Sequence, residues 1–285
     1  MEFKQQRMSV NGIQLNVICE GDDNAPLIIL LHGFPECWLS WKAQIKPLAD
    51  AGYRVWAPDQ RGYNLSDKPS AISDYRIDKL AADVEALRIA AGAEKFHLVG
   101  HDWGAAVAWW YGLHYSDHLR SLTAINVPHP VVFKRTLGRN PKQLLKSWYM
   151  FFFQLPKLPE LLLSLGDFSR LAKGLKSSSN KGAFDQTLMN ELKAAWRQPG
   201  ALTGMLNWYR AAIRRPIKPD NVHISAPTRI LWGVNDIALT PEMASASKDY
   251  CDQVELTYYP EATHWLPHDL PDTVTTEILQ FCDAH

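Results

Sequence analysis

The residue whose type and setting most clearly allow chemistry is Asp102, at the centre of Gly100-His101-Asp102-Trp103-Gly104. An apolar run precedes it and a helical pattern rich in Ala and Trp follows, so the motif lies at a strand-to-helix junction. A G-x-nucleophile-x-G turn holds its central residue in a strained backbone, with the side chain exposed above the sheet. Aspartate is also a good helix N-cap, and that structural explanation would suffice if the motif stood alone.

A carboxylate at this position limits the reactions that are possible. With a reference pKa of about 3.9, aspartate is ionised near pH 7 and needs no base to act as a nucleophile. It is suited to displacement at a saturated carbon, which leaves an ester between the protein and the substrate. Water must then attack the carbonyl carbon of that ester. The pattern therefore predicts a substrate with a strained epoxide, or one with a carbon that carries a halide.

A base and its supporting acid are predicted in the C-terminal part of the chain. Asp236 follows one strand-like run, and His264 lies in the loop after the next one. The order nucleophile, acid, histidine is the one that folds with this turn use. His264 would take a proton from water, and Asp236 would orient and stabilise the imidazolium. His268 is the rival base, whereas Asn126, at the alternative position for the acid, cannot carry the charge.

Two backbone amides are expected to form an oxyanion hole for the second step. The motif His32-Gly33-Phe34-Pro35 follows the first apolar run. A turn there can aim the N–H of Phe34 at the point that the N–H of Trp103 faces. Two such donors stabilise the charge that develops on a carbonyl oxygen.

The elements that must position these residues alternate between strand and helix patterns. Apolar runs of strand length recur towards both ends of the chain, and helical spacing of apolar residues separates them. The predicted strands cover 27–32, 53–59, 96–101, 121–126, 227–236 and 254–260, and the predicted helices include 77–91, closed by Gly92, and 272–282. Such alternation predicts an α/β fold with a mostly parallel sheet and flanking helices.

The pattern changes between residues 130 and 216. This stretch has no convincing strand, is aromatic and helical, and is roughly the size of a small helical domain. Strand and helix patterns resume after it, which argues against two domains in tandem. We therefore expect a core domain formed by 1–129 and 217–285, and a helical cap, or lid, domain formed by 130–216.

Composition and charge exclude several classes of partner. The 285 residues contain 30 Lys and Arg and 30 Asp and Glu, so no field of one sign is expected to attract nucleic acid or a membrane. The four cysteines fit no zinc pattern, and neither a metal nor a cofactor is expected. The N-terminus is polar, without the apolar stretch of a signal peptide, which favours the cytoplasm. Monomer and homodimer remain open.

At this point the chain resembles a known family, the soluble epoxide hydrolases of the α/β-hydrolase fold. The motifs that carry the resemblance are His32-Gly33-Phe34-Pro35-Glu36, Asp59-Gln60-Arg61-Gly62-Tyr63, the turn around Asp102, and the placement of Asp236 and His264. The resemblance covers nearly the whole chain and implies hydrolysis of an epoxide to a vicinal diol, with a small apolar epoxide and water as partners. Related dehalogenases share these core motifs, so the motifs specify fold and nucleophile better than substrate.

Two segments of the helical stretch are more specific. The segment 148–156 resembles the one that supplies the family's first ring-opening tyrosine, which implies Tyr149. The segment Asn207-Trp208-Tyr209-Arg210 resembles the one that supplies the second, which implies Tyr209. Phenol hydroxyls can hydrogen-bond the epoxide oxygen and then protonate the alkoxide, whereas a halide leaving group needs no proton. Cap packing is the structural alternative for both tyrosines.

Further residues are expected at the substrate or beside it. Phe34, Trp103 and Trp208 are predicted to touch the substrate, whereas Glu36 is expected to be structural. A dehalogenase with the same aspartate is the alternative within this class, and the pair Tyr149 and Tyr209 argues against it. A ligand-binding protein on the same scaffold is the alternative from another class, but a pure binder has no need of the histidine and its acid.

Overall fold

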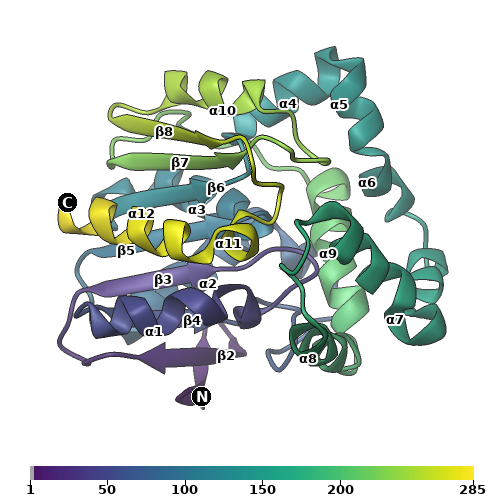
Figure 1. The fold of residues 1–285 in the computed structure, drawn as a ribbon, viewed down its shortest axis with the longest axis horizontal. Coiled ribbons are helices and arrows are strands. Elements are labelled where there is room, and N and C mark those ends of the chain that lie inside the picture. The colour runs from purple at the N-terminus through teal and green to yellow at the C-terminus, as the bar shows by residue number, and fades with distance from the viewer. Residues whose placement is uncertain (1–2) are drawn as a thin grey trace.

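The computed structural model describes residues 3–285, so Met1 and Glu2 of the predicted core domain lie outside the described residues. Its centre is one eight-stranded sheet with the strand order β1-β2-β4-β3-β5-β6-β7-β8 (Figure 1). The strands are β1 (Gln5–Val10), β2 (Ile13–Glu20), β3 (Leu27–Leu31), β4 (Arg54–Pro58), β5 (Phe96–His101), β6 (Leu119–Ile125), β7 (Thr228–Gly233) and β8 (Val254–Tyr259).

The sheet is parallel from β4 to β8 and antiparallel at its N-terminal edge. β2 pairs antiparallel with both β1 and β4, and every other pairing is parallel. β3 is apolar at all five positions because both of its faces are covered. Leu27, Ile29 and Leu31 belong to one hydrophobic cluster, and Ile28 and Leu30 belong to the other. The central strand therefore joins the two layers of the core.

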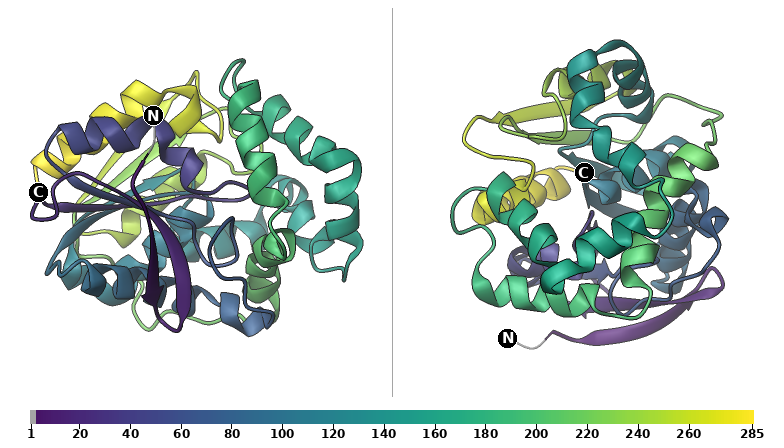
Figure 2. Two further views of the ribbon diagram at one scale, coloured as in Figure 1. Left: turned by 90° about the horizontal axis from the view of Figure 1, so that it is seen from below. Right: turned by 90° about the vertical axis from the view of Figure 1, so that its right-hand side faces the viewer.

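Helices cover both faces of the sheet, as the left view of Figure 2 shows. α1 and α12 contact each other on one face, and α2 and α3 contact each other on the opposite face. The helices outside the insertion are α1 (Lys42–Asp50), α2 (Ile77–Ala90), α3 (Trp103–Tyr115), α10 (Glu242–Ser247), α11 (Leu266–Asp269) and α12 (Pro271–Asp283). The mostly parallel α/β architecture expected from the alternating pattern is confirmed.

Between β6 and β7 the chain forms helices that lie together beyond the carboxyl ends of the parallel strands (Figures 1 and 2). They are α4 (Pro130–Arg139), α5 (Pro141–Lys146), α6 (Trp148–Phe152), α7 (Leu158–Ser178), α8 (Gln186–Trp196) and α9 (Ala201–Arg214). The backbone of α7 leaves the helical conformation at 165–168. We call residues 130–216 the helical insertion. Throughout residues 3–285 no helix combines the length and the apolar character needed to cross a bilayer.

The predicted elements agree with the structure except at the N-terminal edge. The strand at 96–101 is correct at both ends, and the other predicted strands and helices differ by a few residues at their ends. The hairpin of β1 and β2 was not predicted. Its signal is the pair Asn11-Gly12, where both residues have positive φ, as a two-residue hairpin turn requires. β1 alternates between exposed and half-buried residues, so no apolar run marks it.

A buried ion pair ties the loop after β4 to α2. Arg61 donates to both carboxylate oxygens of Asp83, at 2.8 and 2.6 Å, and both side chains are almost fully buried. The carbonyl oxygen of Arg61 also accepts a hydrogen bond of 2.9 Å from the indole of Trp208 in α9. This pair therefore supports the contact between the sheet and the helical insertion.

The substitution Asp83→Ala should lower the free energy of unfolding by about 3–5 kcal/mol, because it leaves the guanidinium of Arg61 buried without a counter-charge. Urea unfolding measures this loss. The matched control is Asp50→Ala, which removes an exposed pair with Lys46 and should cost only about 0.3–0.5 kcal/mol. Equal losses in the two variants would contradict the role of the buried pair.

Candidate active site

Asp102 stands on a strained turn between β5 and α3. Its φ of 51° and ψ of −124° lie outside the regions that L-residues favour. The turn is possible because its neighbours lack a Cβ. A Cβ on Gly33 would lie 2.3 Å from the Cβ of Asp102, and one on Gly104 would lie 2.1 Å from the carbonyl oxygen of Leu31. Glycine is therefore required at these two positions for the backbone to pass so close to Asp102 and Leu31.

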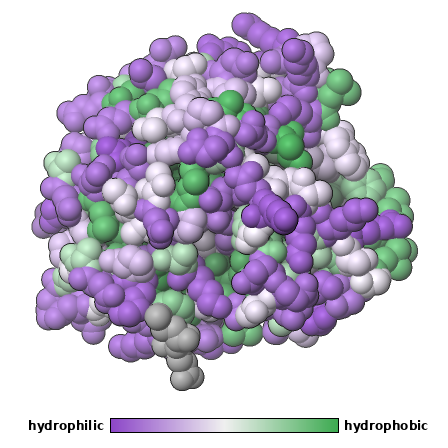
Figure 3. Space-filling view, viewed as in Figure 1, coloured by the Kyte–Doolittle hydropathy of each residue, from purple (hydrophilic) through white to green (hydrophobic). Residues whose placement is uncertain are grey.

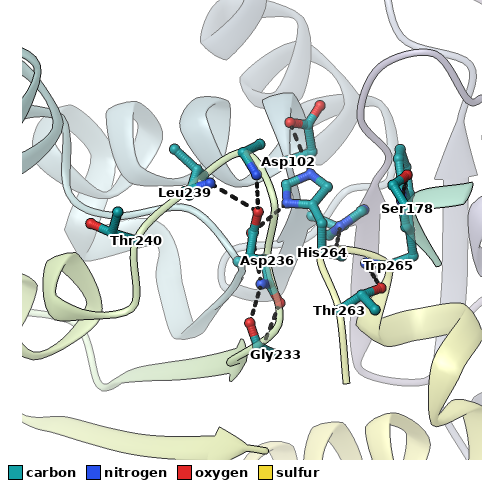
Figure 4. Close-up of polar contacts among 12 residues, drawn as sticks. Asp102, Ser178, Gly233, Asp236, Leu239, Thr240, Thr263, His264 and Trp265 are labelled. Carbon is teal, nitrogen blue, oxygen red and sulfur yellow. Dashed lines mark hydrogen bonds and ion pairs between the residues drawn. The ribbon is translucent and has the colours of Figure 1, made fainter. Parts of the chain in front are cut away.

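His264 lies between two carboxylates, as Figure 4 shows. Its Nδ1 is 2.6 Å from Oδ2 of Asp236, and its Nε2 is 3.4 Å from Oδ2 of Asp102. Asp102 follows β5, Asp236 follows β7, and His264 follows β8, so all three come from the carboxyl ends of parallel strands. Ligand sites of open α/β sheets gather at this edge. The structure thus brings together the three residues that the sequence predicts as nucleophile, acid and base.

Asp236 is held by donors from its own loop and from a neighbouring strand. Its Oδ1 accepts hydrogen bonds from the backbone N–H of Ala238 at 2.7 Å and of Leu239 at 2.9 Å. Its Oδ2 accepts one of 3.0 Å from the side chain of Asn126, which also bonds both backbone groups of Gly233. Sequence reasoning rejected Asn126 as the acid and missed this supporting role. Its place directly after β6 was the available signal.

The shared histidine and the carboxylates shift one another's ionisation. Burial alone would lower the pKa of His264, but the charges of Asp236 and Asp102 outweigh burial and raise it above its ordinary value. Burial alone would raise the pKa of Asp102, but its hydrogen bond and charge interaction with His264 hold it below its ordinary value. Asp102 is therefore a carboxylate near pH 7, facing a protonated imidazole.

The turn that follows β3 points a backbone donor at Asp102. The N–H of Phe34 donates to Oδ1 of Asp102 at 2.7 Å. Buried His32 supports this turn: its Nε2 accepts from the N–H of Gln60 at 3.0 Å, and burial lowers its pKa to about 4, so it stays neutral. The other predicted donor, the N–H of Trp103, lies in the first turn of α3, where amides have no acceptor within the helix.

The rival base His268 has a different partner. Its Nε2 lies 2.6 Å from Oε1 of Glu36, and both side chains are buried. Burial alone would raise the pKa of Glu36, but His268 holds it below its ordinary value. This pair ties the turn after β3 to α11, which agrees with the structural role predicted for Glu36.

A cavity of about 380 Å³ separates Asp102 from the helical insertion. Apart from Asp102 its lining is mainly apolar and aromatic, and Tyr149, Tyr209, Trp103 and Trp208 contribute to it. Among the described residues 3–285, Phe34 is not one of those that line the cavity. Its ring instead packs edge-on against Tyr209, with 5.3 Å between ring centroids.

The two tyrosines come from different helices of the insertion and meet over this cavity. Tyr149 of α6 and Tyr209 of α9 pack edge to face, with ring centroids 5.8 Å apart. Burial, with a smaller contribution from the charge of Asp102, raises the pKa of both phenols above the ordinary value. Both therefore keep their hydroxyl protons near pH 7 and can act as hydrogen-bond donors.

Gln154 and Arg210 hold the two tyrosine segments together. The side-chain amide of Gln154 donates to the carbonyl oxygens of Met150 at 3.0 Å and of Tyr209 at 3.1 Å. The buried guanidinium of Arg210 donates at 3.0 Å to the carbonyl oxygen of Phe153, and it pairs with Glu160 of α7. Both residues lie in segments that the sequence analysis singled out, but their fastening role was not predicted.

Comparison with known proteins agrees with this geometry. Residues 26–271 match the family model described as the α/β-hydrolase fold. The chain belongs to the α/β-hydrolase fold family. A member from Bacillus subtilis, the AB hydrolase superfamily protein YfhM, is 45% identical, and the alignment covers 98% of this chain and 97% of that protein.

Other members of the α/β-hydrolase family that resemble the chain are named for an activity. Human epoxide hydrolase 4 is 39% identical, over 96% of this chain and 77% of that protein. A solved structure described as a novel epoxide hydrolase from metagenomes of hot environments is 33% identical, covers 100% of both chains and superimposes with a TM-score of 0.89. The resemblance to epoxide hydrolases of the α/β-hydrolase fold is confirmed.

The substitution Asp102→Asn should lower the pKa of His264 by about 1–3 units, because it removes one of the two negative charges that stabilise the imidazolium. An NMR titration of the His264 imidazole nitrogens measures the change. Asp78→Asn is the control, since Asp78 pairs with Arg76 outside this site and should leave His264 unaffected. An unaltered His264 pKa in Asp102→Asn would show that the two groups are not coupled.

Proposed function

We propose that the protein is an epoxide hydrolase that adds water to a small apolar epoxide and releases a vicinal diol. The observation that carries the proposal is the position of two protonated phenols, Tyr149 and Tyr209, over the same cavity as the Asp102 carboxylate. A nucleophile on one side and two acids on the other are what the opening of an epoxide ring needs. The names of the similar proteins support the same activity.

In the first step a carboxylate oxygen of Asp102 attacks one ring carbon. A carbon–oxygen bond of the ring breaks, and an ester of the hydroxyalkyl group forms on Asp102. Tyr149 and Tyr209 hold the ring oxygen, and one of them gives its proton to the alkoxide. Since burial favours the neutral phenol, the strongly basic alkoxide is needed to draw the proton away.

In the second step His264 takes a proton from water, and the hydroxide attacks the carbonyl carbon of the ester. The N–H groups of Phe34 and Trp103 hold the oxyanion. The ester bond breaks, and the diol leaves with the proton from His264. The carboxylic acid that remains on Asp102 gives its proton to His264, which restores the starting pair of carboxylate and imidazolium. Asp236 orients the imidazole and stabilises its charged form throughout.

The change of charge on Asp102 explains how His264 can serve as a base. In the free protein, two carboxylates raise its pKa and keep it protonated. Once Asp102 is an ester, one of these charges has gone, the pKa of His264 falls, and the imidazolium gives its proton to the tyrosinate that ring opening leaves. The imidazole then becomes a base at the stage that needs one.

The division of labour follows the two parts of the chain. We propose that residues 130–216 are a cap domain that supplies the tyrosines and Trp208, and that 1–129 and 217–285 are the core domain that supplies the rest. Trp103 and Trp208 would touch the substrate, and Phe34 would contribute mainly its N–H. A cytoplasmic location and an oligomeric state of one or two chains stay predictions, and a role in detoxification would follow from the proposed activity.

Mass spectrometry of a His264→Gln protein mixed with styrene oxide tests the mechanism. Without the base the ester should accumulate, which adds the mass of the whole epoxide to the peptide that carries Asp102. Asp102→Asn is the control and should form no adduct. An adduct that lacks halide, formed from a haloalkane or haloacid but not from epoxides, would assign the protein to the dehalogenases. If neither the epoxides nor the halogenated compounds gave an adduct, the result would favour a ligand-binding protein.

Replacing either cap tyrosine tests the acid catalysis. Tyr149→Phe and Tyr209→Phe should each slow ester formation by on the order of 10²-fold, because general acid catalysis contributes about 10²–10⁴. Ester formation is followed in a single turnover by the change in tryptophan fluorescence, since Trp103 and Trp208 line the cavity. Tyr258→Phe is the control, since the Tyr258 hydroxyl is exposed and bonds only the carbonyl oxygen of Pro241 among residues 3–285. Full rates in both cap variants would remove the phenols from the mechanism.

A further inference from the structure

A strip of exposed apolar side chains runs along the outer side of the helical insertion. Eight of the fourteen large hydrophobic residues that are exposed within residues 3–285 lie between 144 and 165, in or beside α5, α6 and α7. We call them the apolar strip: Leu144, Leu145, Trp148, Phe151, Leu155, Leu158, Leu161 and Leu165. Leu145 is 74% exposed and Trp148 is 63% exposed. Single exposed apolar residues need no explanation, but a gathering of this size marks an interaction surface.

The strip occupies the edge of the molecule farthest from α1 and α12. Figure 3 shows green, hydrophobic atoms gathered at the right-hand edge, where Figure 1 places α6 and α7. Helix α6 faces two ways: Trp148 and Phe151 are exposed, whereas Tyr149 and Met150 line the cavity. In α6 the apolar strip therefore occupies the outer side of a helix whose inner side lines the cavity of the candidate active site.

Charge is distributed very unevenly along the chain, although its sum is zero. The helical insertion, 130–216, contains fifteen Lys and Arg but four Asp and Glu, a formal charge of +11 that the rest of the chain balances with −11. No acidic residue occurs between Asp117 and Glu160. Arg135, Arg139 and Lys142, on the two helices that lead into the strip, are exposed, and residues 3–285 provide none of them with an ion pair. The net charge of zero for the whole chain therefore does not reveal the positive charge of the insertion.

We propose that the apolar strip and the basic residues beside it dock the protein on the surface of an anionic lipid bilayer. Exposed Trp, Phe and Leu with flanking Lys and Arg are the composition of surfaces that lie in a membrane interface without crossing it. Basic residues near an anionic surface strengthen binding about fivefold each. Net charge alone predicts no attraction to a membrane, and the proposal departs from that prediction because the insertion carries a local formal charge of +11.

Other occupants fit the surface less well. A second copy would bring two regions of charge +11 together, and like charges oppose that contact. Nucleic acid would be attracted by the positive charge, and most of its contacts with proteins are made by phosphates. It offers no apolar phase, however, for eight exposed hydrophobic side chains. A bilayer satisfies both properties at once. If the proposed function holds, docking would also place the cavity next to the phase in which apolar epoxides dissolve.

Vesicle flotation tests the docking without any measurement of turnover. The full-length protein should float with phosphatidylcholine vesicles that contain about 30% phosphatidylglycerol, and much less with phosphatidylcholine alone. The double substitution Leu145→Gln and Trp148→Gln should weaken binding by about tenfold, since it removes the most exposed apolar groups. The substitution Lys142→Glu should weaken it by at least about fivefold, and added salt should do the same.

Matched controls lie outside the insertion. Ile89→Gln changes a residue of α2 that is 62% exposed, and Lys95→Glu reverses an exposed charge of the core; both should float like the unaltered protein. An unaltered circular dichroism spectrum and thermal unfolding midpoint show that each variant is folded.

Three results would overturn the proposal: no flotation with anionic vesicles, equal losses in the controls, or a dimer that the double substitution dissociates. Retention on DNA that survives the double substitution would point to nucleic acid instead. A protein that floats but turns over no epoxide would refute the proposed function and leave the docking intact.

Discussion

The structure depends most on the burial of two carboxylates around one imidazole. Taking Asp102, Asp236 and His264 out of water costs several kcal/mol for each charge unless neighbouring groups replace the lost hydration. Three backbone N–H groups and the Asn126 amide do so for the carboxylates, and His264 is shared between them. Because these donors come from the loops after β3, β6 and β7, the site can exist only where the carboxyl ends of neighbouring parallel strands meet.

The same constraint explains why the insertion is held so firmly to the core. A carboxylate open to water would keep its hydration and would be a weak nucleophile, so the face above Asp102 must be covered. The indole of Trp208 bonds the carbonyl oxygen of Arg61, and the indole of Trp196 bonds that of Pro35. Each indole is a buried donor that would be costly to leave unpaired. These bonds keep the insertion in a position where its tyrosines stay over the cavity.

Much of the site was predictable because its signals are local. The backbone around Asp102 needs small residues at fixed positions, and the order of acid and histidine follows from strand order. What the sequence did not reveal depends on partners that are distant along the chain. The support of Asp236 by Asn126 joins residues 110 positions apart. The ring of Phe34 packs against a helix whose placement no local pattern specifies. The hairpin of β1 and β2 was missed for a different reason, since its faces are too polar for an apolar run to appear.

Net charge describes a local surface poorly, for a physical reason that applies beyond this chain. A sum over residues describes the field far from a molecule, but a surface acts within about 10 Å, the distance over which salt screens charges. The insertion and the core carry opposite charges of equal size, so each part has a strong local field that the sum cancels. Helix α6 lies within the basic part, with exposed Trp148 next to Tyr149 of the cavity. A contact on its outer side would therefore act on the same short helix that carries Tyr149.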